Sequence, residues 1–177
     1  MSTVSLDFEK LIDQAKQVVT DPQSYFKSMP QTGGLQGPAI FVLVMGLAAG
    51  LILFLLSIFG LGNLGGQGVF SLFAVVVYPL LVLIATFVGA LIMWVIWRLM
   101  GSSKDYEVAF RCISACTAIL PICALLSVFG ALGALAQGLW GCYLGYLASL
   151  HVHKIKAQTA QIVFGIFALL NVLGALS

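Results

Sequence analysis

Five long apolar runs, separated by short polar or glycine-rich connectors, set the pattern of this chain. Each run holds about the 20 mainly apolar residues that a helix needs to cross a bilayer. The pattern therefore predicts an all-α membrane protein, a bundle of five transmembrane helices. The expected spans cover residues 38–61, 70–99, 108–129, 132–150 and 157–175.

Prolines and glycines indicate where these runs bend and turn. Pro79 in the second run and Pro121 in the third each lack a backbone N–H, so we expect a helix kink at both. The third and fourth runs together are far too long for one crossing, and a hairpin at Gly130 is expected to separate them.

The residues before the first run predict two short helices. In the first of them, apolar side chains recur at helical spacing and charged side chains lie on the opposite side of the helix. This pattern indicates an amphipathic helix that is too short and too charged to cross the bilayer. Asp21-Pro22 predicts a second helix from Pro22 to about Ser28. We therefore divide the chain into a cytoplasmic amphipathic segment, 1–37, and a five-span domain, 38–177. The first helix either docks on a membrane or partner or simply covers the cytoplasmic ends of the bundle.

Charge is confined to three short patches, at residues 7–27, 98–111 and 154–156. They hold all eight Lys and Arg residues and all six Asp and Glu residues. Charged side chains are 8% of the chain, against about 25% in soluble proteins, and each is costly inside a bilayer. Lys and Arg favour the cytoplasmic side. Five crossings place all three patches there, so we expect a multi-pass plasma (bacterial inner) membrane protein with a cytoplasmic N-terminus and an extracytoplasmic C-terminus.

These patches and the amphipathic helix predict a cytoplasmic interface. Arg98 and Arg111 can lie along apolar surface with their charged heads in water, or one can pair with Asp105 or Glu107 to hold the second loop in shape. An exposed pair contributes under about 1 kcal/mol, so anchoring is the simpler interpretation. The candidate interface residues are Phe8, Leu11, Ile12, Arg98, Arg111, Lys154 and Lys156.

Two glycine pairs predict close helix packing. Gly46 and Gly50 lie four residues apart in the first run, and Gly141 and Gly145 in the fourth. Small residues at this spacing let helices approach closely in lipid. They indicate packing within the bundle or, alternatively, association with a second copy.

Candidate chemistry is sparse. Cys112 and Cys116 lie one helical turn apart, and with His151 and His153 they are weak candidates for a zinc site, since four ligands would have to converge from two helix ends. We expect no metal, no cofactor and no enzymatic activity, because no catalytic set and no phosphate-binding loop is present. A mid-span charge, typical of ion-coupled carriers, is also missing. The net charge of +2, spread over both signs, predicts no nucleic-acid partner.

The order of several motifs carries a family resemblance. They are Asp21-Pro22-Gln23-Ser24-Tyr25-Phe26, then Gly34-Leu35-Gln36-Gly37-Pro38, then Gly101 to Ala109 ahead of a proline-bearing span, and a basic stretch after the fourth span. Over about residues 20–175 the chain resembles the Ypt-interacting protein (Yip) domain family, in its compact prokaryotic form. The resemblance implies five crossings, a cytosolic N-terminus and, in eukaryotic members, contact with Rab-type GTPases in vesicle traffic. Gly34 and Gln36 replace an aspartate and a tyrosine of the eukaryotic motif, which argues against GTPase binding here.

The sequence thus predicts a non-enzymatic membrane-organising, adaptor or trafficking-like protein. It would act by helix packing and through a cytoplasmic docking face formed by residues 1–37, 101–107 and 151–156. The bilayer, a second copy or other membrane proteins are its expected partners. The alternative is a transporter, channel or scramblase for a small neutral solute or lipid, with helices broken at the prolines. A polar cavity lined by Thr86, Ser114, Thr117 and Gln137 would favour that alternative.

Overall fold

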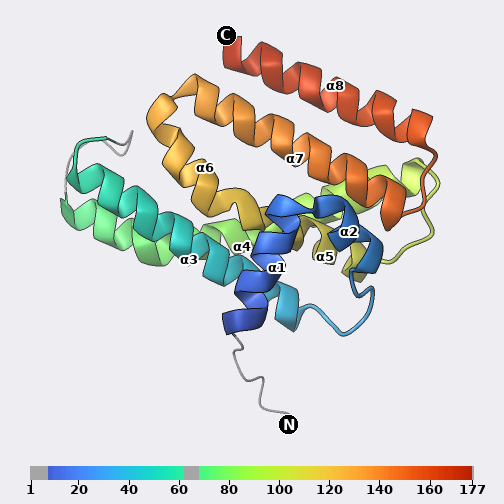
Figure 1. Cartoon of the computed structure of the whole chain (residues 1–177), viewed down its shortest axis with the longest axis horizontal. Helices are drawn as coiled ribbons and strands as arrows, with labels where there is room; N and C mark the ends of the chain where they lie inside the picture. The colour runs from blue at the N-terminus through green and yellow to red at the C-terminus, as the bar shows by residue number, and fades with distance from the viewer. Residues whose placement is uncertain (1–7, 62–67, 177) are drawn as a thin grey trace.

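The structure, a computed structural model, describes residues 8–61 and 68–176, and these residues form helices joined by short connectors. The helices are shown in Figure 1. They are α1 (Phe8–Thr20), α2 (Pro22–Ser28), α3 (Gln36–Ile58), α4 (Gly68–Leu99), α5 (Tyr106–Cys116), η1 (Thr117–Ile119), α6 (Leu120–Leu126), η2 (Ser127–Phe129), α7 (Ala131–His151) and α8 (Ala157–Leu176).

Four of the expected crossings correspond to helices that are long and apolar enough to span a membrane. They cover Gln36–Ile58, Val75–Leu99, Tyr106–Phe129 and Ala157–Ala175, with mean hydropathies of 2.9, 2.6, 2.3 and 1.5. The remaining expected crossing forms α7, which is helical over 21 residues but is not among the four. Its glycines, tyrosines and Gln137 make α7 less apolar than the other long helices. Over residues 8–61 and 68–176 the structure is therefore all-helical, with four candidate spans.

Two antiparallel helix pairs flank a central, broken helix. The pair α3–α4 lies on one side, the pair α7–α8 on the other, and α5 and α6 connect them (Figure 1). Helix α8 packs mainly on α7, whereas α3 packs on α4, α5 and α6.

The third candidate span is interrupted once by a 3₁₀ segment and ends in a second one. Short 3₁₀ segments follow α5 and α6, and Pro121 lies in the first turn of α6, where its missing N–H costs least. Gly130, with φ of 58°, then starts the turn into α7. In contrast, α4 continues as an α-helix through Pro79.

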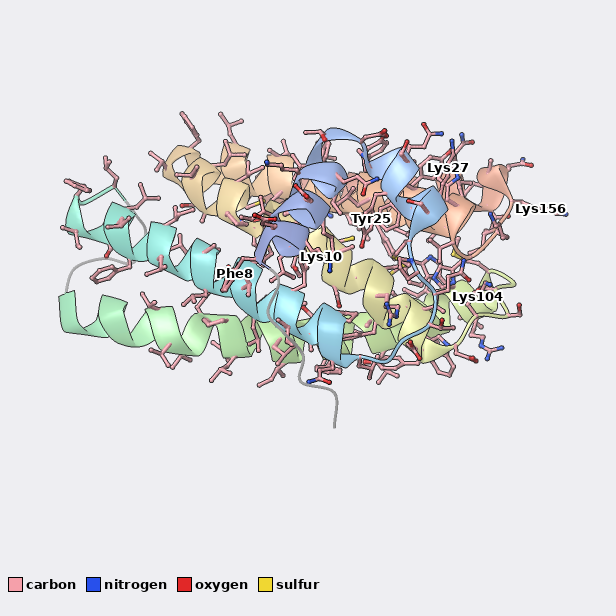
Figure 2. The ribbon with its side chains drawn as sticks, turned by 60° about the horizontal axis from the view of Figure 1, so that its bottom comes forward. Phe8, Lys10, Tyr25, Lys27, Lys104 and Lys156 are labelled. Carbon is pink, nitrogen blue, oxygen red and sulfur yellow. The ribbon has the colours of Figure 1, made fainter. Side chains whose placement is uncertain are left out.

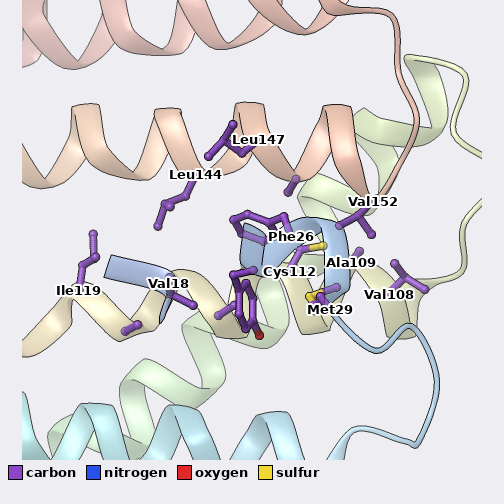
Figure 3. Packing of buried hydrophobic residues seen from close by; sticks show 14 of the residues in the cluster. Val18, Phe26, Met29, Val108, Ala109, Cys112, Ile119, Leu144, Leu147 and Val152 are labelled. Atoms are coloured by element: carbon purple, nitrogen blue, oxygen red, sulfur yellow. The ribbon is translucent and has the colours of Figure 1, made fainter. Parts of the chain in front are cut away.

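The N-terminal hairpin of α1 and α2 is part of the protein core. The Asp21 side chain accepts a hydrogen bond from the Ser24 backbone N–H at 3.1 Å and so caps α2. Val18 and Phe26 are 0% and 1% exposed, and they pack with side chains of α5 and α7 (Figure 3). In addition, α1 contacts η1, in the middle of the third candidate span. The hairpin therefore reaches further along the bundle than a cap over the helix ends would.

Large apolar side chains form a continuous exposed stripe along α4. Its members recur every three to four residues, so they share one helix face. A protein in water rarely exposes so large an apolar surface, and lipid is its natural surrounding. The stripe consists of Val76, Leu80, Leu81, Ile84, Val88, Leu91, Ile92, Val95 and Leu99.

The mild polar residues of the spans bond to their own helices. The hydroxyls of Thr86, Ser114 and Thr117 are buried and donate to the carbonyls of Val82, Phe110 and Ser114 at 2.7, 2.6 and 2.6 Å. Gln137 instead is exposed on α7. The three hydroxyls are each satisfied by a nearby backbone carbonyl, which is the pattern of a packed interior, and Gln137 does not join them.

Glycines bring helices into close contact, and not always at the predicted pairs. Gly46 lies against Pro79 of α4, and Gly50 lies more loosely against Val75. On α7, Gly145 lies against the ring of Phe164 of α8, but Gly141 has open space around it. A glycine seven residues before Gly145, not considered from the sequence, makes the second contact: Gly138 faces Asn171 of α8.

Replacing Gly46 and Gly141 with alanine should have opposite effects on stability. A Cβ at Gly46 would lie 2.9 Å from the Pro79 Cα, and overpacking of this kind costs about 1–3 kcal/mol. A Cβ at Gly141 meets nothing within 4 Å, so alanine there should stabilise by up to about 1 kcal/mol through better helix propensity. Thermal unfolding in lipid nanodiscs measures both. Equal shifts in the two variants would contradict the observed α3–α4 contact.

Candidate interaction face

Three segments distant in sequence meet at one end of the molecule, and we call residues 21–37, 101–107 and 151–156 the charged face. Lys104 Nζ donates to Gln31 Oε1 at 2.7 Å, which joins the first two segments. Ser102 Oγ and His153 Nδ1 lie 2.8 Å apart and join the second to the third. Figure 2 shows Lys27, Lys104 and Lys156 at this end, with Phe8 and Lys10 further along the bundle.

A clamp of two charged side chains fixes the chain ahead of α3. The Gly34 N–H donates to Glu107 Oε1 at 2.8 Å, and Arg111 Nη2 donates to the Gly34 carbonyl at 2.7 Å. Arg111 Nε also donates to Glu107 Oε1 at 3.2 Å. Gly33 and Gly34 adopt φ values of 115° and 79°, which favour glycine. The predicted pairing of Arg111 thus orders residues 33–34 rather than the second loop alone.

Replacing Glu107 with alanine should release this clamp. The lost acceptor is charged but partly exposed, so the free energy needed to open this loop should fall by about 1 kcal/mol. Amide hydrogen exchange at Gly34 should therefore be about fivefold faster. Asp105→Ala is the matched control, since that side chain is 90% exposed and lies 4.0 Å from Arg98. If exchange at Gly34 is unchanged in Glu107→Ala, the clamp does not hold the loop.

His153 is the centre of a buried polar joint. It is 4% exposed, stacks on Trp97 with ring centroids 3.9 Å apart, and its Nε2 lies 3.9 Å from Cys112 Sγ. Trp97 Nε1 donates to Ser149 Oγ at 2.7 Å. These contacts connect the end of α4, the second loop, α5 and α7.

The charge state of His153 follows from this setting. Burial, helped by the positive charge of Lys104, lowers the pKa of His153 to about 4. The imidazole is therefore neutral at neutral pH, with one ring nitrogen as donor and the other as acceptor.

The four weak metal candidates are only partly brought together. Cys112 and His153 are neighbours, but Cys116 Sγ donates to the Cys112 carbonyl at 3.3 Å. His151 lies in the last turn of α7, with its Nε2 buried and unpaired in the described part of the chain. Over residues 8–61 and 68–176, no group of three or more His, Cys, Asp or Glu side chains is placed to hold a metal ion.

The predicted interface residues divide by exposure. On α1, Phe8 and Ile12 are 59% and 50% exposed, whereas Leu11 packs against the core cluster. Lys154 and Lys156 are exposed, and Lys154 has φ of 56°.

The two arginines differ as well. Arg98 lies over the Trp94 ring, 5.4 Å from its centroid, and is 45% exposed. Arg111 is 12% exposed and is taken up by the clamp. The charge of Arg98 is therefore accessible at the surface, and that of Arg111 is not.

Several residues in or next to this face were given no site role from the sequence. Gln31 and Ser102 form bonds within the face. Trp97, outside it on α4, donates to Ser149. Tyr25 is buried, with its hydroxyl accepting from Gln14 Nε2 at 3.1 Å. Burial raises the pKa of Tyr25. A tryptophan at the end of an apolar run is the one sequence signal that could have indicated Trp97.

Comparison with known proteins gives one family match. Residues 16–177 match the family described as the Yip1 domain. No curated protein and no solved structure matches the chain.

Proposed function

Since this chain belongs to the Yip1 domain family of membrane proteins, we propose that it is a non-enzymatic membrane-organising protein that docks a partner on its charged face. Its expected partners are a soluble cytoplasmic protein, a neighbouring membrane protein or a second copy. The carrying observation is that three separate segments are tied into one surface by the contacts of Gln31, Gly34 and His153. A surface held in a fixed shape loses little conformational freedom when a partner binds.

The proposal includes five crossings, with α7 as the fourth and with the 1–37 and 38–177 division made from the sequence. An odd number of crossings places all three segments of the charged face on one side, where the positive-inside rule puts Lys and Arg. We propose that this side is the cytoplasm of a plasma (bacterial inner) membrane. Compartment-specific labels at residue 2 and at Ser177 should report opposite sides, and labels on the same side would exclude five crossings.

Exposed charge supports docking at this face. Lys27, Lys154 and Lys156 are exposed on α2 and after α7, and the Asp105 carboxylate is 90% exposed. Both signs are present, which gives a partner complementary charges to recognise and fixes its orientation.

Site-specific photo-cross-linking in native membranes tests the docking face. A photoreactive residue at Lys156 should capture one defined partner, and charge reversal by Lys27→Glu with Lys154→Glu should reduce that capture. Leu132, 71% exposed next to the turn at Gly130, provides the matched control position. Equal capture at Lys156 and Leu132 would contradict a docking face.

Liposomes with the purified full chain test the transport alternative. We expect neither flux of a neutral solute nor lipid scrambling above that of protein-free liposomes, since Thr86, Ser114 and Thr117 bond within their own helices. If scrambling or flux is observed and is unchanged by Lys27→Glu with Lys154→Glu, transport and not docking is the function.

A further inference from the structure

A groove runs along the joint between α7 and α8, next to the charged face. Its volume is about 340 Å³. Leu139 and Tyr143 on its α7 wall are 40% and 43% exposed, and Gly165 on the α8 wall has open space around it. Because α8 is a candidate span with few buried residues, the groove opens toward lipid. It is lined by Leu139, Cys142, Tyr143, Tyr146, Gln161, Phe164, Gly165 and Ala168.

The end of the groove nearest the charged face is polar and accessible. Gln161 Nε2 donates to the Tyr146 hydroxyl at 3.5 Å, and this pair is exposed. Gln161 lies four residues after the start of α8 at Ala157, which is about 6 Å along the helix axis. The headgroup layer adds roughly 5–8 Å to each side of the hydrocarbon, and tyrosine is enriched at this boundary. The pair therefore lies at the depth of lipid esters, with the rest of the groove in hydrocarbon.

Two cations lie above the polar end of the groove. Lys154 and Lys156 are exposed in the connector that leads into α8, and within residues 8–61 and 68–176 neither forms an ion pair. The chain has no Asp or Glu after Glu107, so α7, α8 and their connector offer these lysines no counter-ion. Anionic lipids of the cytoplasmic leaflet attract basic segments at this position.

We propose that this groove binds one anionic phospholipid of the cytoplasmic leaflet. Its phosphate lies at Lys154 and Lys156, and an ester carbonyl reaches the Tyr146–Gln161 pair. One acyl chain follows the apolar wall past Tyr143 and Phe164. Cations, exposed polar pair and apolar wall thus come in the order of headgroup, ester and chain. The proposal rests on α7 as a crossing, as proposed above, but not on a protein partner.

Lipid selectivity measured by native mass spectrometry tests the headgroup end. The full chain, in mild detergent with equal amounts of phosphatidylglycerol and phosphatidylethanolamine, should retain one phosphatidylglycerol in preference. Lys156→Gln should reduce this preference about fivefold, since one lysine near an anionic surface contributes about 1 kcal/mol. Lys16→Gln is the matched control, because Lys16 is also exposed but lies on α1. Equal preferences in the two variants would overturn the proposal.

Two glycines test the chain end of the groove. Gly165→Leu places a side chain in the groove and should lower phosphatidylglycerol retention at least tenfold. Gly141→Leu is the matched control, because Gly141 also has open space around it but does not line the groove. If both variants retain the lipid equally, it does not bind between α7 and α8.

Photo-cross-linking in liposomes of the same two lipids covers the case in which a variant folds poorly. A photoreactive residue at Tyr143 should capture phosphatidylglycerol in preference, whereas one at Ile166, 52% exposed on α8 but outside the groove, should capture both lipids equally. Capture of a second copy of the chain at Tyr143, or of both lipids equally there, would overturn the proposal. These liposomes hold no docking partner, so failure of this proposal and failure of docking are read separately.

Discussion

Replacing Phe26 with alanine is expected to be among the most damaging single changes, lowering the free energy of unfolding by about 3–5 kcal/mol. Phe26 is 1% exposed and lies in the core cluster with Val18, Leu144 and Leu147 (Figure 3). Removing its ring leaves a cavity between α2 and α7 that the packed helices cannot fully close. For a chain of this size, the loss corresponds to a fall in Tm of roughly 6–20 °C.

Thermal unfolding in lipid nanodiscs measures this effect. Phe8→Ala is the control, since Phe8 lies on the neighbouring helix and is 59% exposed, and its Tm should change little. If Phe26→Ala unfolds at the wild-type temperature, the N-terminal hairpin is a loosely attached cap and not part of the core. The charged face, whose first segment begins in that hairpin, would then lose its fixed shape.

Acidification should destabilise the protein through His153. Its pKa is about 4 in the folded protein against an ordinary value of 6.5, because it is buried next to Lys104. Between these values the unfolded chain binds a proton that the folded protein does not, so stability falls as pH is lowered from about 6.5 to 4. At about 1.4 kcal/mol per pKa unit, the free energy of unfolding should fall by about 3 kcal/mol over this range. His153 makes its full contribution to stability above pH 6.5.

Unfolding free energies at several pH values between 7.5 and 4 test this prediction. His153→Phe is the control, because phenylalanine can still stack on Trp97 but carries no titrating group. At pH 7.5 the variant should be less stable than the wild type, because phenylalanine cannot bond to Ser102. Its free energy of unfolding should also vary less with pH. Parallel pH profiles for wild type and variant would assign the acid sensitivity to other groups.

The burial of Phe26 bears on how function should be tested. Deleting the N-terminal segment would remove Val18 and Phe26 from the core, so a loss of partner binding after deletion would not locate the docking face. Charge reversal at Lys27 and Lys154 changes the exposed surface and spares the packing. That choice separates a docking defect from unfolding.

Local features of the sequence determined the helical class and most helix positions. Runs of apolar residues and caps act through neighbours along the chain, so Asp21-Pro22 begins α2 and Gly130 begins the turn into α7 as expected. The helical class and the family resemblance are confirmed. The five crossings remain a prediction, since α7 is only moderately apolar and hydropathy alone does not place it in the bilayer.

Only the tertiary structure decided which side chains meet. The spacing of glycines along one helix does not show which face of that helix meets a neighbour. It indicated Gly141 together with Gly145, whereas Gly138 and Gly145 are the glycines that contact α8. Likewise, the sequence could not show that Arg111 reaches Gly34 or that His153 stacks on Trp97. The contacts of Arg111 and His153 join residues more than fifty positions apart. They depend on how whole helices pack, which no local pattern encodes.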